Sequence, residues 1–290
     1  MSKHRIKIPS WQKRRLAAPK PPLGAVITYQ RALRKWLSGL QEEWLKLFLD
    51  GWERNPVHFS GAVPRSDAAR TPPGSTYVRE RLGAAEIILQ EAIAPGSQLS
   101  RDIRVLAARV NKKGEVEFRR LVGISPRAEL GAGAALDSFR DKNVAKIKSL
   151  AGQQLDEITA ILANAEIEAM RVEDIRAQLL DRFDVNKSKA DLLARDQVLK
   201  LNGELTQVRQ EGVGITQYIW TTSHDERVRG NPAGKWPHGL HYQLDGTVQS
   251  WADPPICSPD GRREHPGLDY QCRCTAFPIL PELQAPQAPP

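Results

Sequence analysis

Four residues near the C-terminal end have side chains suited to binding a metal ion. They lie within eighteen residues and include every cysteine of the chain: Cys257, His265, Cys272 and Cys274. Thiolate and imidazole are preferred ligands of tetrahedral zinc, and a structural zinc ion can organise a Gly- and Pro-rich segment with little core. His241 or His238 could replace His265 as the nitrogen ligand. Alternatively, the thiols are reduced and pack as small apolar groups, with Arg273 paired to an acid.

A second group of histidines and aspartates precedes the cysteines. It consists of His224, Asp225, His238, His241 and Asp245. A nuclease could use such side chains to bind a divalent ion and activate water. However, Asp245 followed by Gly246 is also typical of a tight turn, and Asp225 suits the first turn of a helix. We expect a structural role, and therefore predict no enzymatic activity.

Two arginines and three tryptophans of this region each allow a structural and a nucleic-acid-binding interpretation. Arg227 and Arg229 could form salt bridges with nearby aspartates, namely Asp225, Asp245 or Asp269, or they could contact phosphate. The tryptophans are Trp220, Trp236 and Trp251. We expect them to fill a small core, and stacking on bases is the alternative.

Positive charge is concentrated at the N-terminus. Residues 1–40 contain ten Lys and Arg and no acid, whereas the remaining 250 residues carry 32 bases and 34 acids. Such an arm could bind DNA or an acidic partner by releasing counterions. The alternative is a solubilising tail. The predicted contact residues are Lys3, Arg5, Lys7, Lys13, Arg14, Arg15 and Lys20.

The distribution of Pro, Gly and apolar residues predicts an α+β protein with five segments. These are a flexible basic arm (1–28), an α+β region (29–136) with a linker at 55–75, a helical region (137–214), a loop-rich module of short strands (215–280) and a Pro-rich flexible tail (281–290). No window is long and apolar enough for a membrane helix, and no signal peptide is evident. We therefore expect a soluble protein made in the cytosol.

Apolar periodicity and capping residues predict the individual elements. Helical spacing runs from Tyr29 to Phe48 and resumes after residue 137. Further helices are expected at 172–183 and 188–208, ended by Gly212 and Gly214. Alternation around residues 111–114 predicts a hairpin of strands 105–110 and 116–122. A strand is expected at 218–222, and Ser223 with Glu226 predicts a helical turn at 225–229.

Three motifs occur in order along the C-terminal segment, from Trp220 to Arg229, from His241 to Gly246 and from Pro266 to Cys274. Together they resemble the Mu-type minor head protein family, the head-morphogenesis family of tailed bacteriophages, over roughly residues 137–280. The chain has a longer segment between Arg229 and His241 than is usual there. The motif residues are Trp220, Asp225, Arg227, Arg229, His241, Asp245, Gly246, Pro266, Gly267, Asp269, Cys272, Arg273 and Cys274.

The resemblance implies a role in assembling the DNA-filled head. It implies a virion protein made in the host cytoplasm and located inside the head near the portal vertex. The implied partners are the portal protein, the major capsid or scaffold protein, and packaged phage DNA, with no membrane involved. The alternative function is that of a metal-dependent nuclease or DNA-binding protein that uses the His/Asp group.

Overall fold

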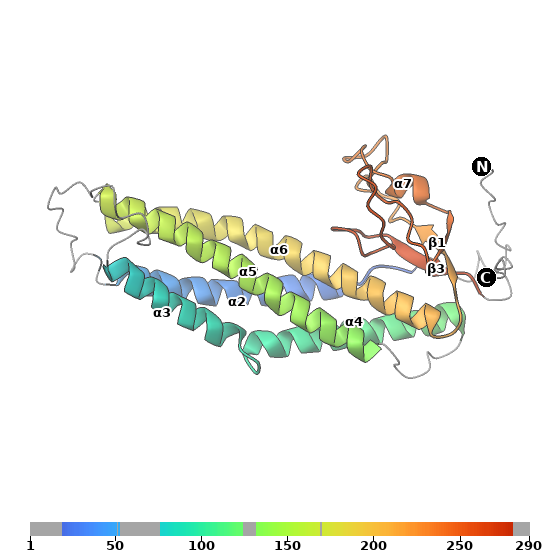
Figure 1. Ribbon diagram of the computed structural model, residues 1–290, viewed down its shortest axis with the longest axis horizontal. Helices are drawn as coiled ribbons and strands as arrows, with labels where there is room; N and C mark the ends of the chain where they lie inside the picture. The colour runs from blue at the N-terminus through green and yellow to red at the C-terminus, as the bar shows by residue number, and fades with distance from the viewer. Residues whose placement is uncertain (1–18, 51, 53–75, 124–131, 169, 281–290) are drawn as a thin grey trace. The chain divides into compact units, whose positions relative to one another are not determined.

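The computed structural model describes residues 19–50, 52, 76–123, 132–168 and 170–280 (Figure 1). The predicted linker (55–75), the C-terminal tail (281–290) and residues 1–18 of the predicted arm lie outside these residues. Long helices form most of the described chain: α2 (Leu23–Leu49), α3 (Thr76–Ile93), α4 (Gln98–Val122), α5 (Ala132–Ile167) and α6 (Val172–Glu211). The chain divides into two compact units, one made of residues 29–103 with 141–194 and the other of residues 1–28, 104–140 and 195–290.

The first unit is a bundle of helices around a large apolar core. The predicted apolar face of α2 is buried, with Leu33, Leu37 and Trp44 fully inaccessible to solvent. The Trp44 indole N–H donates to the carbonyl of Ala85 in α3 at 3.2 Å. Each fully buried apolar side chain contributes about 1.5–3 kcal/mol, more than surface ion pairs contribute, so packing holds this unit together.

Residues 105–122 form part of helix α4, so the predicted β-hairpin is wrong. The buried side chains of α4 recur at three- and four-residue intervals, as in Ile103, Leu106 and Val110. The Asn and Gly residues of segment 111–114, which suggested a turn, instead lie against the side chain of Arg209. The Arg209 guanidinium donates to the Asn111 carbonyl at 2.9 Å, and a Cβ at Gly114 would come within 2.6 Å of it. The glycine therefore serves a close approach between helices, not a chain reversal.

Helix α6 is continuous from Val172 to Glu211, although two helices were predicted there. Ser188, predicted as a helix N-cap, lies inside it, because tertiary burial of residues on both sides outweighs a local capping preference. The predicted helix end is confirmed, since α6 stops before Gly212 and Gly214 adopts a φ of +79°. Helix α2 begins at Leu23 and so takes in the last residues of the segment interpreted as an arm.

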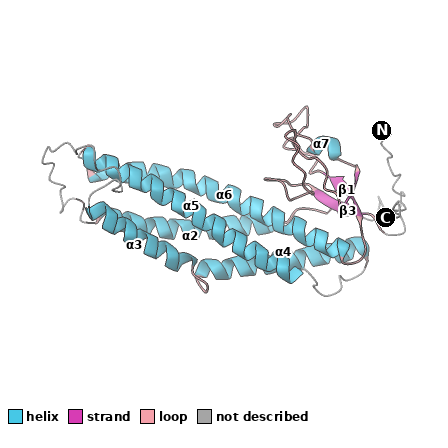
Figure 2. Cartoon of the chain, viewed as in Figure 1, coloured by secondary structure: helices cyan, strands magenta, loops and turns pink. Residues whose placement is uncertain are grey.

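The C-terminal module, residues 215–280, contains short elements: strands β1 (Gln217–Thr221), β2 (Val248–Ser250) and β3 (Thr275–Pro278), and the short helix α7 (His241–Leu244). The strands form an antiparallel sheet in the order β2-β1-β3, drawn in magenta in Figure 2. The predicted strand at 218–222 and the α+β class are confirmed. None of the described helices has the length and apolar character needed to span a bilayer.

Candidate functional site

The C-terminal module is built around the central strand β1. On one face of the sheet, Tyr218 and Trp220 pack with Trp251 and the three cysteines in a single buried cluster. On the other face, Ile219 packs with Leu121 of α4 and with Phe277 and Ile279. The alternation of β1 thus separates an aromatic and thiol-rich core from an aliphatic one.

His241 lies at the centre of the thiol-rich core, where it is 2% exposed. Its Nδ1 atom is 3.5 Å from the Sγ atom of Cys272 and 3.4 Å from that of Cys274. Its other ring nitrogen, Nε2, is 3.1 Å from Oδ2 of Asp269. The imidazole therefore connects a carboxylate on one side with two sulfur atoms on the other.

Asp269 is held in place by more groups than His241 alone. Its side chain is 1% exposed and forms salt bridges with Arg229 at 2.8 Å and Arg262 at 2.9 Å. It also accepts the backbone N–H of Tyr270 at 2.8 Å. Burial raises the pKa of this carboxyl, but the bond to His241 and the two arginines outweigh burial and lower the pKa to about 2. Asp269 is therefore an ionised, fully hydrogen-bonded carboxylate that fixes the orientation of the imidazole.

The pKa shifts in the cluster favour a protonated, positively charged His241 beside a Cys272 thiolate. Burial lowers the pKa of His241, but hydrogen bonds with Asp269, Cys257 and Cys272 outweigh it and raise the pKa to about 10. Burial raises the pKa of Cys272, yet bonds with Cys274 and His241 bring it well below the usual thiol value. Cys274, bonded to Cys272 and buried, has its pKa raised. The core thus stabilises an anionic sulfur, which is the form that binds metals.

The structure brings the three predicted cysteine ligands together but not the predicted histidine ligand, His265. Cys257, Cys272 and Cys274 share the buried cluster, and Cys257 lies within 4.8 Å of His241 and Asp269 in its ligand atom. His265 is engaged elsewhere, because its Nδ1 atom is 2.9 Å from the Tyr218 hydroxyl. Its pKa is lowered by burial, against which a hydrogen bond with the backbone of Trp251 acts. His265 is therefore engaged by Tyr218 and Trp251, and His241 is the imidazole that faces the thiols.

The loop that carries Cys272 is fixed to helix α6. The backbone N–H of Gln271, which has a positive φ of 52°, donates to the carboxylate of Asp196 at 2.8 Å. The Arg195 guanidinium donates to the Gln271 side chain. A second close approach involves Gly203 of α6, where a Cβ would lie 3.1 Å from the carbonyl oxygen of Pro266. These α6 contacts could not be read from the motif spacing, because each joins residues more than sixty positions apart.

The predicted His/Asp group is divided among separate interactions. Asp245 accepts the backbone N–H of Thr222 at 2.8 Å and lies 3.0 Å from Nε2 of His224. Asp225 pairs with Arg273 instead, and His241 lies in the thiol-rich core. Within the part of the chain that the structure describes, no metal-binding cluster of three such groups includes His224, Asp225 or Asp245.

The segment at Asp225 is a turn, so the predicted helical turn at 225–229 is wrong. Asp225 Oδ1 accepts the backbone N–H of Arg227 at 3.0 Å, and Ser223 donates to the same carboxylate at 3.3 Å. This side-chain bonding competes with helix formation. Arg227 extends into solvent, with 57% of its side chain exposed, and lies 4.0 Å from Glu226.

The long segment between Arg229 and His241 closes on itself. The Gly230 N–H donates to the Trp236 carbonyl at 2.8 Å, and the Tyr242 N–H donates to the Arg229 carbonyl at 3.0 Å. The two motif residues that flank this segment therefore remain neighbours. Trp220 and Trp251 are buried as expected, whereas Trp236 in this segment is 60% exposed.

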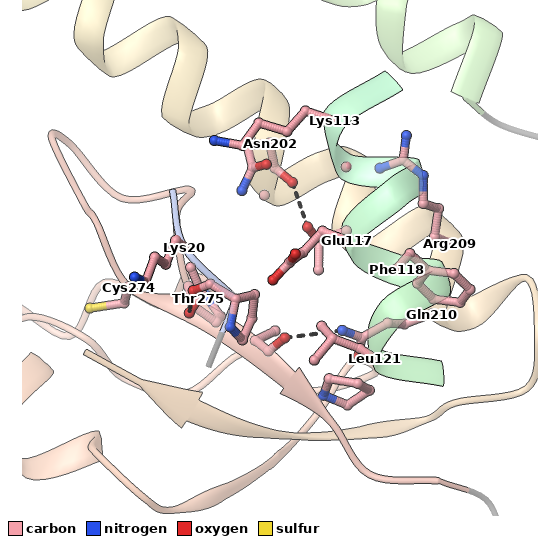
Figure 3. A pocket seen from close by; sticks show the side chains of 17 residues that line it. Lys20, Lys113, Glu117, Phe118, Leu121, Asn202, Arg209, Gln210, Cys274 and Thr275 are labelled. Carbon is pink, nitrogen blue, oxygen red and sulfur yellow. Dashed lines mark hydrogen bonds between the residues drawn. The ribbon is translucent and has the colours of Figure 1, made fainter. Parts of the chain in front are cut away.

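A cleft lies beside β3, between the ends of α4 and α6 (Figure 3). Its lining includes Lys20, Lys113, Glu117 and Arg209. The hydroxyl of Thr275 donates to the carbonyl of Pro19 at 3.1 Å. The first described residues of the chain are thus attached to the C-terminal module.

Residues 156–277 match the model of a protein family described as Phage Mu protein F like protein. Over this segment the chain is similar to the Mu F-like family. The Mu F-like region covers less than half of the chain, from within α5 to within β3, and includes all of α6. The resemblance inferred from the three motifs is therefore confirmed. The Mu F-like family is one of phage head-morphogenesis proteins.

The chain was also compared with curated proteins and with solved structures. An uncharacterized protein of Haemophilus influenzae is 37% identical to this chain over 138 residues. The aligned region makes up 48% of this chain but 28% of that protein, so the chain spans less than a third of the relative's length. No solved structure matches the chain.

Proposed function

We propose that this chain is a minor head protein of a tailed bacteriophage that acts in head morphogenesis. The observation that carries the proposal is the match of residues 156–277 to the Mu F-like family. In this proposal the protein is made in the host cytoplasm and becomes part of the virion, inside the head near the portal vertex. Its partners are the portal protein, the major capsid or scaffold protein, and packaged DNA.

The basic N-terminal residues are proposed to bind DNA or an acidic surface of a partner. The bond between Thr275 and the Pro19 carbonyl supports this role, because it holds the residue that follows most of the basic sequence against the C-terminal module. The adjoining cleft carries further positive charge from Lys20 and Lys113. A basic sequence joined to a folded module can neutralise phosphates by counterion release.

The assembly role is tested in the phage or prophage that carries the gene. Virions and heads made without this protein are purified, and the protein is quantified against the portal by mass spectrometry. The proposal expects a few copies per particle and defective or DNA-poor heads in the absence of the protein. Normal, DNA-filled heads that never contain the protein would refute the proposal.

The arm is tested separately by measuring DNA affinity at several salt concentrations. Replacing Lys13, Arg14 and Arg15 with Gln should reduce the slope of log affinity against log salt by about 0.9 for each phosphate that is no longer neutralised. The matched control replaces Lys146, Lys148 and Arg176, three exposed bases of the helical unit, with Gln. Equal slopes for the two triple variants would show that the arm does not bind the DNA.

The nuclease alternative has a direct assay. DNA is incubated with the pure protein and Mg²⁺, Mn²⁺ or Zn²⁺, alongside the variants His241→Ala and Asp245→Asn. Metal-dependent cleavage that disappears in a variant would replace the assembly proposal with an enzymatic one. Intact DNA under all three conditions is the expected result, since the His/Asp group is spread over separate structural contacts.

A further inference from the structure

Two sulfur atoms approach the same imidazole nitrogen in the thiol-rich core. A single ring nitrogen carries either one proton or one lone pair, so it can form one good hydrogen bond but not two. Cys272 and Cys274 nevertheless lie 3.5 and 3.4 Å from Nδ1 of His241. In tetrahedral zinc sites, with Zn–S bonds of about 2.3 Å and Zn–N bonds of about 2.0–2.1 Å, sulfur and nitrogen ligands are separated by about 3.5 Å. The three atoms therefore have the spacing of ligands that share one ion.

We propose that the C-terminal module binds a structural zinc ion through Nδ1 of His241 and the thiolates of Cys257, Cys272 and Cys274. Cys257 is assigned as the fourth ligand because it is a buried thiol of the same cluster. Its sulfur lies within 4.8 Å of ligand atoms of His241 and Asp269, in a group separate from that of His241, Cys272 and Cys274. Its sulfur interacts with His241 and contacts the carbonyl of Arg262 at 3.4 Å. Four protein ligands leave no open position, which is the mark of a structural site and not a catalytic one.

Neighbouring groups form the hydrogen bonds that orient the ligands of a zinc site. Asp269 accepts the N–H of Nε2, which leaves the lone pair of His241 on Nδ1, facing the sulfurs. The backbone N–H of Gly267 donates to the Cys272 sulfur at 3.4 Å. The ion, three thiolates, the Asp269 carboxylate and the guanidinium groups of Arg229 and Arg262 together carry no net charge. The buried site is therefore electrostatically balanced when it is loaded.

A buried donor points to anionic sulfur at Cys274 independently. The Trp220 indole N–H is inaccessible to solvent and interacts with the Cys274 sulfur, but it makes no hydrogen bond of normal geometry within the described residues. It packs in the same cluster as Cys274. An unpaired buried donor is costly, and a metal-bound thiolate is an acceptor that would satisfy it. In Figure 3 the Cys274 sulfur points away from the side chains that line the cleft.

The module has a physical need for such an ion. Its strands contain five, three and four residues, and its helix contains four. Small sheets of this kind bury too little apolar surface to be stable without support from elsewhere. Zinc binding adds directly to the free energy of folding, since the assembled site does not exist in the unfolded chain. Coordination of zinc would thus add to the support that the module receives from packing on α4 and α6.

Metal content provides the first test. The full chain is purified without a histidine tag or chelator, and its zinc is measured by plasma mass spectrometry. We expect about one zinc per chain, and we expect chelation to lower the melting temperature reversibly. A folded protein with less than about a tenth of a zinc per chain, whose melting temperature is unchanged by zinc or chelator, would overturn the proposal.

The ligand set is tested with paired histidine variants. His241→Gln should lose the metal, whereas His265→Gln, a buried histidine of the same module bonded to Tyr218, should retain it. Loss in His265→Gln with retention in His241→Gln would overturn the assignment. Because a Cys→Ser variant could fail to fold, cobalt is exchanged into the wild-type protein, where the thiolate-to-cobalt absorption should report three sulfur ligands. Asp269→Asn should weaken zinc binding about 10- to 100-fold.

Discussion

The guanidinium of Arg273 donates two hydrogen bonds to the carboxylate of Asp225, at 2.5 and 2.7 Å. This bidentate pair joins the turn after β1 to the Cys272–Cys274 segment, 48 residues later. Arg273 lies between the two cysteines, so the pair holds the segment that carries them. Arg273 is thus paired to an acid, as one interpretation of the sequence expected, and connects two parts of the module.

The first prediction concerns this pair. Lysine keeps the charge of arginine but cannot form the planar, two-bond contact, so Arg273→Lys should lower the free energy of unfolding by about 1 kcal/mol. Arg227→Lys is the matched control, because Arg227 is exposed and makes no comparable contact. Urea denaturation of the two variants measures the difference. Equal stability would mean that the pair contributes nothing to folding.

A second prediction gives the acid dependence of the same contact. The hydrogen bonds from Arg273 lower the pKa of Asp225, although partial burial acts to raise it. A carboxyl with a lowered folded-state pKa contributes stability above its unfolded value, about 3.9, and loses it as the pH falls through the folded value. The stability difference between wild type and Asp225→Asn should therefore shrink as the pH falls below about 4. A constant difference down to about pH 2 would contradict the assignment.

The third prediction uses two helical glycines. A Cβ at Gly203 would lie 2.8 Å from Leu268 and 3.1 Å from the Pro266 carbonyl, whereas nothing lies within 4 Å of a Cβ at Gly152. Gly203→Ala should therefore destabilise the protein by about 1–3 kcal/mol, since the backbone of Pro266 cannot easily move aside. Gly152→Ala should stabilise it by about 0.5–1 kcal/mol through helix propensity. Thermal melts of both variants test the pair, and opposite signs are expected.

Local signals in the sequence predicted the parts of the fold that are decided locally. The β-branched and aromatic run at Tyr218–Trp220 predicted β1, and Gly212 predicted the end of α6. The α4 segment was misread, because Gly114 lies inside a helix against the distant Arg209 side chain and not in a turn. Such a contact leaves no trace in neighbouring residues, so the local pattern pointed to the wrong structure.

In the candidate site, too, the sequence predicted what is local in the chain but not the contacts between distant residues. The sequence placed the three cysteines together, because they are close in the chain, and it offered three histidines as their partner. Only the fold distinguishes the histidines. The Tyr218 hydroxyl is hydrogen-bonded to His265, whereas helix α7 places His241 beside Cys272. The role of Asp269 as the anchor of His241 was also beyond sequence reasoning, because 28 residues separate the two.

The last prediction concerns the helical unit. The Tyr29 hydroxyl, buried in α2, donates to Oδ1 of Asn143 in α5 at 3.0 Å. Tyr29→Phe keeps the ring packing but removes the donor, so the free energy of unfolding should fall by about 0.5–1.5 kcal/mol. Tyr242→Phe, at a residue 48% exposed, is the control and should change stability by less than about 0.5 kcal/mol. If the two variants melt alike, the buried bond is not a net stabiliser, and apolar packing alone holds α2 against α5.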